Sequence, residues 1–177
     1  MTSRWVVEVA PLKGVAVRWR AYSLDIDKAD GPTTAQKALR VVEAVWAEHG
    51  DEPIGRLYTE IGTRFHLRED KSVDAVADAL EAAGLDRGLV AAADDEQWDK
   101  EIRGSMAEAI ELVGDDVGVP ILVFTDGDRA AGISGPVMSP AVTGEAALAL
   151  WDNVVGVAWN PQVFELKRAR TSAKPRP

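Results

Sequence analysis

The order of hydrophobic periodicities along the chain restricts its fold more than any other feature. Within residues 33–113, apolar residues recur in four successive segments at the spacing of amphipathic helices. Alternating or short apolar runs, which are typical of β-strands, stand on both sides of this block. Strand signals separated by a helical block favour an α/β domain interrupted by a helical insertion over an all-helical protein.

Caps and helix-breaking residues set the expected boundaries. A helix is predicted over residues 2–9, ended by Pro11 and Gly14, and the alternation of Val15–Tyr22 predicts a strand. Four helices are predicted next: from the cap Thr33 or Thr34 to Gly50, over 54–65, from the cap Ser72 to Gly84, and over 98–113. A hairpin of Ile121–Thr125 and Arg129–Ser134 around Asp126–Gly127 follows. A last helix is predicted over 147–157.

Composition excludes several classes of protein. A length of 177 residues predicts one domain, with room for an inserted subdomain. The net charge of −9 argues against nucleic acid and anionic membranes as partners. No apolar run approaches the roughly 20 residues of a transmembrane helix, and the N-terminal residues lack the pattern of a signal peptide. A soluble, cytoplasmic protein is therefore expected.

The sequence contains no cysteine, which excludes disulfides, thiolate nucleophiles and cysteine metal sites within these residues. His49 and His66 are far apart and have no third ligand nearby, so no metal site is predicted. The segment Asp25–Gly31 resembles a calcium-binding loop, but Ala29 and Gln36 occupy two ligand positions of that motif. A solvated loop is the better interpretation.

Acidic and aromatic residues have simple structural interpretations. Asp94–Glu96 is predicted to be a helix N-terminus, where carboxylates complement the helix dipole, and Asp115–Asp116 a solvated loop. No carboxylate pair stands out for general acid–base catalysis, although that chemistry stays open. Trp46, Trp98 and Trp151 lie on apolar stripes and are predicted to be in the core.

Pro120 directly precedes the apolar run of residues 121–124. Proline gives no N–H to a sheet, so it belongs at the start or edge of a strand. One interpretation is a trans proline that begins the strand, since only about 5–6% of X-Pro bonds are cis. The other is a cis-proline loop that shapes a substrate site. The residues alone leave both open.

Several strings taken together resemble one known family along nearly the whole chain. They are Ser3–Trp5 leading into Glu8–Ala10, Ser23–Leu24, Leu57–His66, Gly114–Pro120, Gly135–Ser139 and Phe164–Arg168. Each is weak alone, but their order resembles the DsbA-like thioredoxin-fold proteins of the FrnE type. The greatest similarity is to the actinobacterial branch of mycothiol-dependent nitroreductases.

The resemblance implies an α/β, thioredoxin-like (DsbA-type) fold with an all-helical insertion. Residues 1–30 and 114–170 would form a discontinuous thioredoxin-like domain, 33–113 the helical insertion subdomain, and 171–177 a disordered tail. In such proteins a cis-proline loop in the cleft between the subdomains binds substrate through its backbone. A cis Val119–Pro120 bond is therefore expected.

The substrate-binding residues implied by the resemblance are Gly118, Val119 and Pro120, with Tyr22 and Trp5 as flanking neighbours. No catalytic residue is assigned, because the Cys-Pro-Trp-Cys motif that precedes the first helix in the family is absent. Lys28 aligns with an asparagine on the family's substrate side.

The first, central strand of the fold is also absent ahead of the helix at residues 2–9. Its loss would leave a gap of about twice 4.8 Å between the two flanking strands. The chain is therefore expected either to be poorly stable alone, or to close the gap with a partner strand or by direct antiparallel pairing. A start site set too far downstream and a protein that has lost catalysis both explain these sequence features.

The predicted function is that of a DsbA-like thiol–disulfide oxidoreductase family member of the mycothiol-linked reductase type, inactive as written. The alternative is a non-catalytic thioredoxin-fold protein for binding or chaperone-like work. A third hypothesis, carboxylate catalysis in the cleft, has no motif behind it. The expected partner is a small-molecule or thiol substrate. No bound cofactor is predicted, mycothiol serves the family as co-substrate, and a homodimer is left open.

Overall fold

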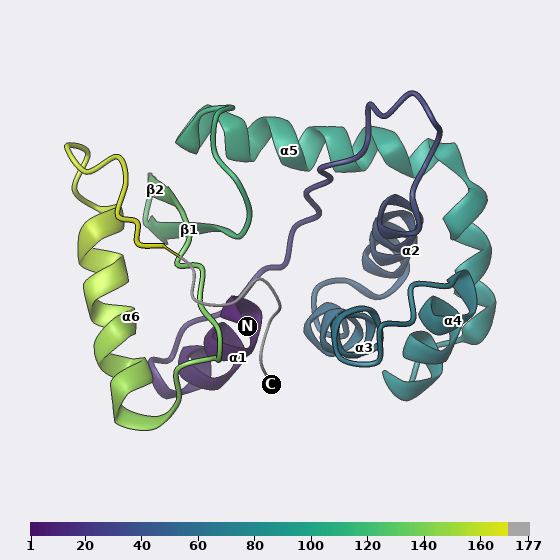
Figure 1. The fold of residues 1–177 in the computed structure, drawn as a ribbon, viewed down its shortest axis with the longest axis horizontal. Helices are drawn as coiled ribbons and strands as arrows, with labels where there is room; N and C mark the ends of the chain where they lie inside the picture. Colours follow the sequence, from purple (N-terminus) through teal and green to yellow (C-terminus); the bar gives the residue numbers. More distant parts are fainter. Residues whose placement is uncertain (170–177) are drawn as a thin grey trace. The chain divides into compact units, whose positions relative to one another are not determined.

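The computed structural model describes residues 1–169, which form two compact units (Figure 1). Unit 1 combines Met1–Val17 with the chain from Glu108 onward, and unit 2 is Arg18–Ala107. The architecture is mixed α/β, mostly helical, and the described residues contain one two-stranded sheet. The predicted thioredoxin-like and insertion domains stay a prediction, and the predicted tail of residues 171–177 lies outside the described residues.

Unit 2 contains the predicted block of helices, at the boundaries that the caps indicated. Thr33 Oγ1 accepts the N–H of Gln36 at 3.2 Å, Ser72 Oγ accepts that of Ala75 at 3.0 Å, and Gly50 ends a helix at φ +74°. The elements are α2 (Thr34–His49), α3 (Ile54–His66), α4 (Val73–Ala82), the 3₁₀ helices η1 (Arg87–Asp94) and η2 (Glu96–Trp98), and most of α5 (Asp99–Val113).

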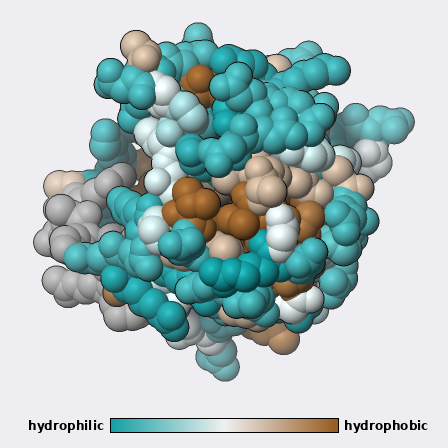
Figure 2. Space-filling view, turned by 90° about the vertical axis from the view of Figure 1, so that its right-hand side faces the viewer, coloured by the Kyte–Doolittle hydropathy of each residue, from teal (hydrophilic) through white to brown (hydrophobic). Residues whose placement is uncertain are grey.

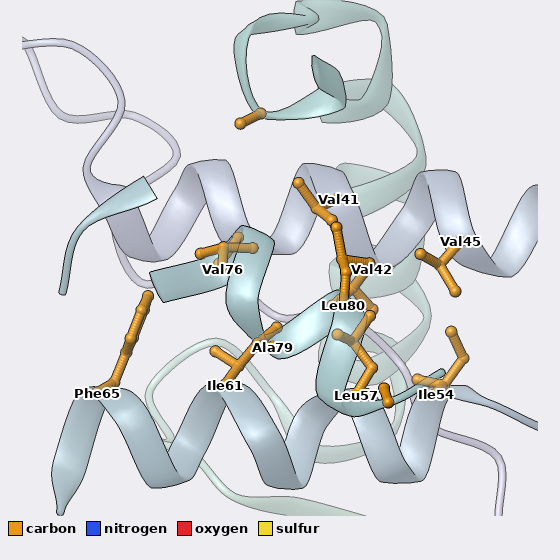
Figure 3. Close-up of a cluster of buried hydrophobic side chains, with 13 residues drawn as sticks. Val41, Val42, Val45, Ile54, Leu57, Ile61, Phe65, Val76, Ala79 and Leu80 are labelled. Atoms are coloured by element: carbon orange, nitrogen blue, oxygen red, sulfur yellow. The ribbon is translucent and has the colours of Figure 1, made fainter. Parts of the chain in front are cut away.

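The apolar stripes of α2, α3 and α4 form the core of unit 2. In Figure 3 the labelled side chains of these helices point toward one another. Val41, Val45, Ile54, Leu57 and Leu80 are all no more than 1% exposed. Burial of such side chains contributes about 1.5–3 kcal/mol each, so this core holds the helical block together.

Unit 1 consists of α1 (Thr2–Leu12), the hairpin β1 (Ile121–Asp126) and β2 (Arg129–Ser134), α6 (Gly144–Ala158) and the end of α5. The strands are antiparallel, with Asp126 opposite Arg129 across the predicted turn. Trp5 is fully buried, and its indole N–H donates to the carbonyl of Ala147 at 3.0 Å. The ring of Trp151 lies 5.6 Å from that of Trp5 and 5.5 Å from that of Phe124. These rings join α1, α6 and β1.

The predicted strand at Val15–Tyr22 is wrong, because this segment has no regular secondary structure. Among residues 1–169, β1 and β2 pair only with each other, and a strand cannot exist without a neighbour for its backbone. The N–H of Val15 instead donates to the carbonyl of Ala10 at 2.9 Å, beyond the end of α1.

Two of the three tryptophans predicted to be in the core are partly exposed. Trp151 is 7% exposed, but Trp46 is 37% exposed and Trp98 is only half-buried. The indole N–H of Trp46 donates to Asp51 at 2.8 Å, and the guanidinium of Arg18 lies 5.3 Å from the centre of its ring. Polar partners at the edge and face of the ring explain why an apolar stripe ends at the surface here.

We predict opposite effects for two glycine-to-alanine substitutions. A Cβ at Gly132 would lie 2.5 Å from Val113 Cγ1, so Gly132→Ala should overpack unit 1 and destabilise it by about 1–3 kcal/mol. A Cβ at Gly62 on α3 would meet nothing within 4 Å, so Gly62→Ala should stabilise unit 2 by about 0.4–1 kcal/mol. Urea unfolding followed by circular dichroism measures both. A Gly132→Ala variant as stable as the parent would contradict the packing described here.

Candidate functional site

The loop before β1 and the turn after β2 lie together at one end of the hairpin. The N–H of Gly135 donates to the carbonyl of Pro120 at 2.7 Å, and Ser134 Oγ donates to the carbonyl of Gly118 at 2.6 Å. The Val119–Pro120 bond is cis, which confirms the expectation from the resemblance. The Gly135–Pro136 and Ser139–Pro140 bonds are also cis, which the sequence did not predict.

The N-terminal end of α1 reaches the same region of unit 1. Thr2 Oγ1 donates to the carbonyl of Pro136 at 2.6 Å, directly after the turn that follows β2. Met1 is the N-cap residue, and its side chain makes no hydrogen bond to the N–H groups of the first turn. Such N–H groups carry the positive end of the helix dipole and favour an anionic group. This end of unit 1 therefore combines a loop, a turn and a helix N-terminus.

The structure places the five predicted substrate-binding residues in different settings. Gly118, Val119 and Pro120 form the loop, and Val119 is 40% exposed. Trp5 belongs to the same unit but lies in its core, with its N–H already bonded. Tyr22 is partly buried in unit 2. The substrate contacts of all five, and a cleft beside the loop, stay predictions.

Sequence reasoning missed the two hydroxyls that hold this end of unit 1 together, those of Thr2 and Ser134. Ser134 is the last residue of the predicted second strand and stands opposite Ile121. A hydroxyl at the end of a hairpin beside a glycine-containing loop was the available signal, because Ser and Thr side chains readily bond to nearby backbone.

The other edge of β1 is open in the part of the chain that the structure describes. Because Pro120 and Gly135 form a hydrogen-bonded pair, the alternation of an antiparallel ladder turns the N–H and C=O groups of Ile121, Val123 and Thr125 away from β2. No backbone bond to these groups is present among residues 1–169. Such an edge can accept an extended strand.

Unit 2 contains a buried polar network around Arg40, which is 3% exposed. Its Nε and NH2 groups donate to the two carboxylate oxygens of Asp99 at 2.8 and 2.7 Å. Gln36 Nε2 donates to Asp99 at 2.7 Å, and the hydroxyl of Ser23 donates to the amide oxygen of Gln36. The bond to Arg40 lowers the pKa of Asp99, so this carboxylate is ionised and fully engaged. The contacts of the Asp99 carboxylate indicate a structural role.

The half-buried carboxylate of Glu43 on α2 is perturbed in the opposite direction. Burial raises the pKa of Glu43, and the charge of Arg20 opposes this shift. Within residues 1–169, no group of three or more histidine, aspartate or glutamate side chains could hold a metal ion. In the same range, no helix combines the length and apolar character needed to cross a membrane.

Comparison with known proteins identifies the family. The sequence profile of the Rv2466c-like family, described as mycothiol-dependent nitroreductase Rv2466c, matches residues 1–168. The chain belongs to the Rv2466c-like family. A relative from Mycobacterium tuberculosis (strain ATCC 25618 / H37Rv), named uncharacterized protein Rv2286c, is 31% identical over 183 residues. The alignment covers 97% of this chain and 77% of that relative. The family match confirms the resemblance to the mycothiol-dependent branch and supports an oxidoreductase-type family.

Breaking the pair between Arg40 and Asp99 should destabilise unit 2. In an Asp99→Asn variant the charge of Arg40 stays buried without a counter-charge, which should lower the free energy of unfolding by about 3 kcal/mol. Thermal and urea unfolding at pH 7 measure this loss. A double variant, Arg40→Met with Asp99→Leu, serves as the control and should recover most of the stability.

The same pair predicts an acid dependence. The pKa of Asp99 is lowered from its ordinary value of 3.8, so the contribution of the pair is complete above that value. It is lost as the pH falls through the lower pKa of the folded state. The parent should therefore lose more stability than Asp99→Asn between pH 5 and about pH 2. If the stability of the parent and that of Asp99→Asn fall equally between these pH values, the contribution of the ion pair is contradicted.

Proposed function

We propose that the protein binds a small thiol of the mycothiol class, or its disulfide, at the end of unit 1 formed by Thr2, Gly118–Pro120 and Pro136, and that it serves a mycothiol-linked reductase system. The observation that carries this proposal is the exposed Val119 loop, held beside Thr2 and Pro136 in unit 1 of a chain of the Rv2466c-like family. A helix N-terminus favours thiolate over thiol, which suits a ligand of this chemistry.

The proposal includes a thioredoxin-like, DsbA-type fold for residues 1–30 with 114–170, interrupted by a helical insertion at 33–113. The split order of helices and hairpin supports it. The open edge of β1 also supports it, because a further strand would find the backbone groups of Ile121, Val123 and Thr125 in position. The family match is consistent with this fold.

Thiol–disulfide exchange requires a thiolate that attacks one sulfur of a disulfide, forms a mixed disulfide and releases the other sulfur as a thiolate. Residues 1–177 contain no cysteine, so they supply no attacking sulfur. We therefore propose that these residues bind and orient the thiol or disulfide, while all three reacting sulfur atoms come from substrates. On this proposal the chain as written does not catalyse exchange by itself.

A second candidate function is non-catalytic binding of an extended peptide. The open edge of β1 favours it, together with Val119 and Val123, which are 40% and 43% exposed. Main-chain bonds along such an edge give affinity, and alternate side chains of the peptide give specificity. A chaperone-like role would follow from the same contacts.

Binding of the thiol ligand is tested with Val119→Asp. The new carboxylate should occupy the exposed position beside the loop and has to be desolvated when the ligand binds, which should weaken binding of mycothiol disulfide by about fivefold or more. The control is Leu12→Asp, at the far end of α1 and about 15 Å along the helix from Thr2, which should bind as the parent does.

Calorimetry and amide chemical shifts measure that binding. Shifts at Thr2, Gly118 and Val119 in the parent support the proposed site. If an unstructured peptide produces these shifts and mycothiol disulfide does not, the peptide-binding alternative replaces the proposal. Equal affinity of Val119→Asp and the parent for mycothiol disulfide would refute the site.

Thiol–disulfide exchange is tested by introducing a cysteine into the chain. The parent should not accelerate reduction of insulin disulfides by mycothiol. Ser3→Cys places a thiol in the first turn of α1, where the helix dipole should bring its pKa below the ordinary value of about 8.5. Leu12→Cys, at the exposed C-terminal end, should not show this shift. Thiolate absorbance against pH measures both, and equal pKa values would show that the end of α1 does not stabilise a thiolate.

A further inference from the structure

Unit 2 contains a pocket of about 470 Å³ between α2 and the two 3₁₀ helices. Its walls are mostly small or apolar, and they come from α2 and from η1 with η2. Figure 2 shows that apolar residues gather on one face of the molecule within a hydrophilic surround. The apolar lining residues are Ala44, Ala47, Leu89, Ala91, Ala92 and Trp98.

Small side chains explain why this space is open. Ala44 and Ala47 are three residues apart on α2 and so share one face of that helix. Ala91 on η1 adds only a methyl group, while Leu89 packs partly against the core of unit 2. Trp98 borders the pocket and is only half-buried, so it forms a wall rather than filling the space.

The polar groups of the lining give the pocket a negative rim. The carboxylates of Glu48 and Asp95 line it, together with Gln97, and the lining includes no lysine or arginine. His49 Nε2 lies 3.4 Å from the Glu48 carboxylate, and the backbone N–H of Gln97 donates to Asp95 at 3.0 Å. Neither contact brings a permanent cation to the rim.

Three basic side chains of the neighbouring elements are engaged elsewhere. Lys37 pairs with Asp94 at 2.6 Å, Arg40 with Asp99 at 2.7 Å, and Arg87 with Asp78 at 2.5 Å. Since the whole chain carries a net charge of −9, the field at the rim attracts cations and repels anions.

We propose that this pocket binds a small compound with an apolar, preferably aromatic, body and an ammonium group. The body lies on the alanines and Leu89 against the face of Trp98, and the ammonium group lies at the carboxylates of Glu48 and Asp95. The volume of about 470 Å³ falls in the usual range for small-molecule sites, roughly 300–1,000 Å³. The depression is open to solvent, since Ala47, Glu48, Ala91 and Gln97 of its lining are exposed.

The test is a titration in which tryptamine in its protonated form, tryptammonium, is added to the ¹⁵N-labelled full chain and followed by NMR. Saturable shifts of the Trp98 indole and of the amides of Ala47 and Ala91 are expected. Indole-3-propanoate has a similar size and the opposite charge, and it should bind at least about tenfold more weakly. Equal binding of the two probes would refute the role of the carboxylates.

Matched variants separate charge from shape. Glu48→Gln with Asp95→Asn, which keeps a side chain able to cap η2, should weaken tryptammonium binding by about fivefold. Ala47→Leu fills the pocket with a good helix-forming residue and should abolish saturable binding. Ala82→Leu changes an exposed alanine of α4 outside the pocket and should bind as the parent does.

Two other outcomes would overturn the proposal. One is the absence of saturable shifts at millimolar tryptammonium, and the other is a set of shifts confined to residues outside the pocket lining. The result does not depend on the thiol site of unit 1, because Val119→Asp should leave tryptammonium binding unchanged.

Discussion

The bidentate pair of Arg40 with Asp99 is the interaction on which the arrangement of unit 2 depends. Arg40 rises from the middle of α2, and its guanidinium also donates to the carbonyl of Ala93 at 3.2 Å. One side chain therefore fixes α2 to the end of η1 and to the first turn of α5. The pocket proposed to bind an ammonium compound, called the amine pocket below, lies between α2 and the helices η1 and η2. Because Arg40 bonds α2 to η1, the spacing of these two walls depends on the neutralised charge of Arg40.

Trp5 has the corresponding role in unit 1, through packing rather than charge. Its ring and indole N–H bind α1 to α6, and the aromatic contacts continue through Trp151 to Phe124 on β1. The helix N-terminus and the Gly118–Pro120 loop are the outer ends of elements joined by this cluster. The proposed thiol site is thus supported from within by apolar contacts that no ligand touches.

Local signals in the sequence predicted the helices of both units and the hairpin well. Caps such as Thr33 and Ser72 act within three residues of themselves, so the sequence alone reveals them. The strand at Val15–Tyr22 failed because pairing depends on a distant neighbour that alternation cannot supply. The cis bond at Pro120 followed from family resemblance, not from residue pattern. The amine pocket joins α2 with residues about forty positions later, and alanine patterns do not distinguish a hollow from a filled contact.

Because unit 1 is made of two separate chain segments, it cannot fold completely until late in synthesis on the ribosome. Unit 2 is continuous and helical, so its contacts are close in sequence and can form early during synthesis. Helix α1 leaves the ribosome before unit 2, but its partner α6 begins only at Gly144. The side chains of Trp5 and Val9, which are buried in the folded protein, therefore lack their partner helix while all of unit 2 is synthesised. A helix synthesised before unit 2 thus reaches its final place only after unit 2 is complete, and chaperones have their main opportunity to bind it during that interval.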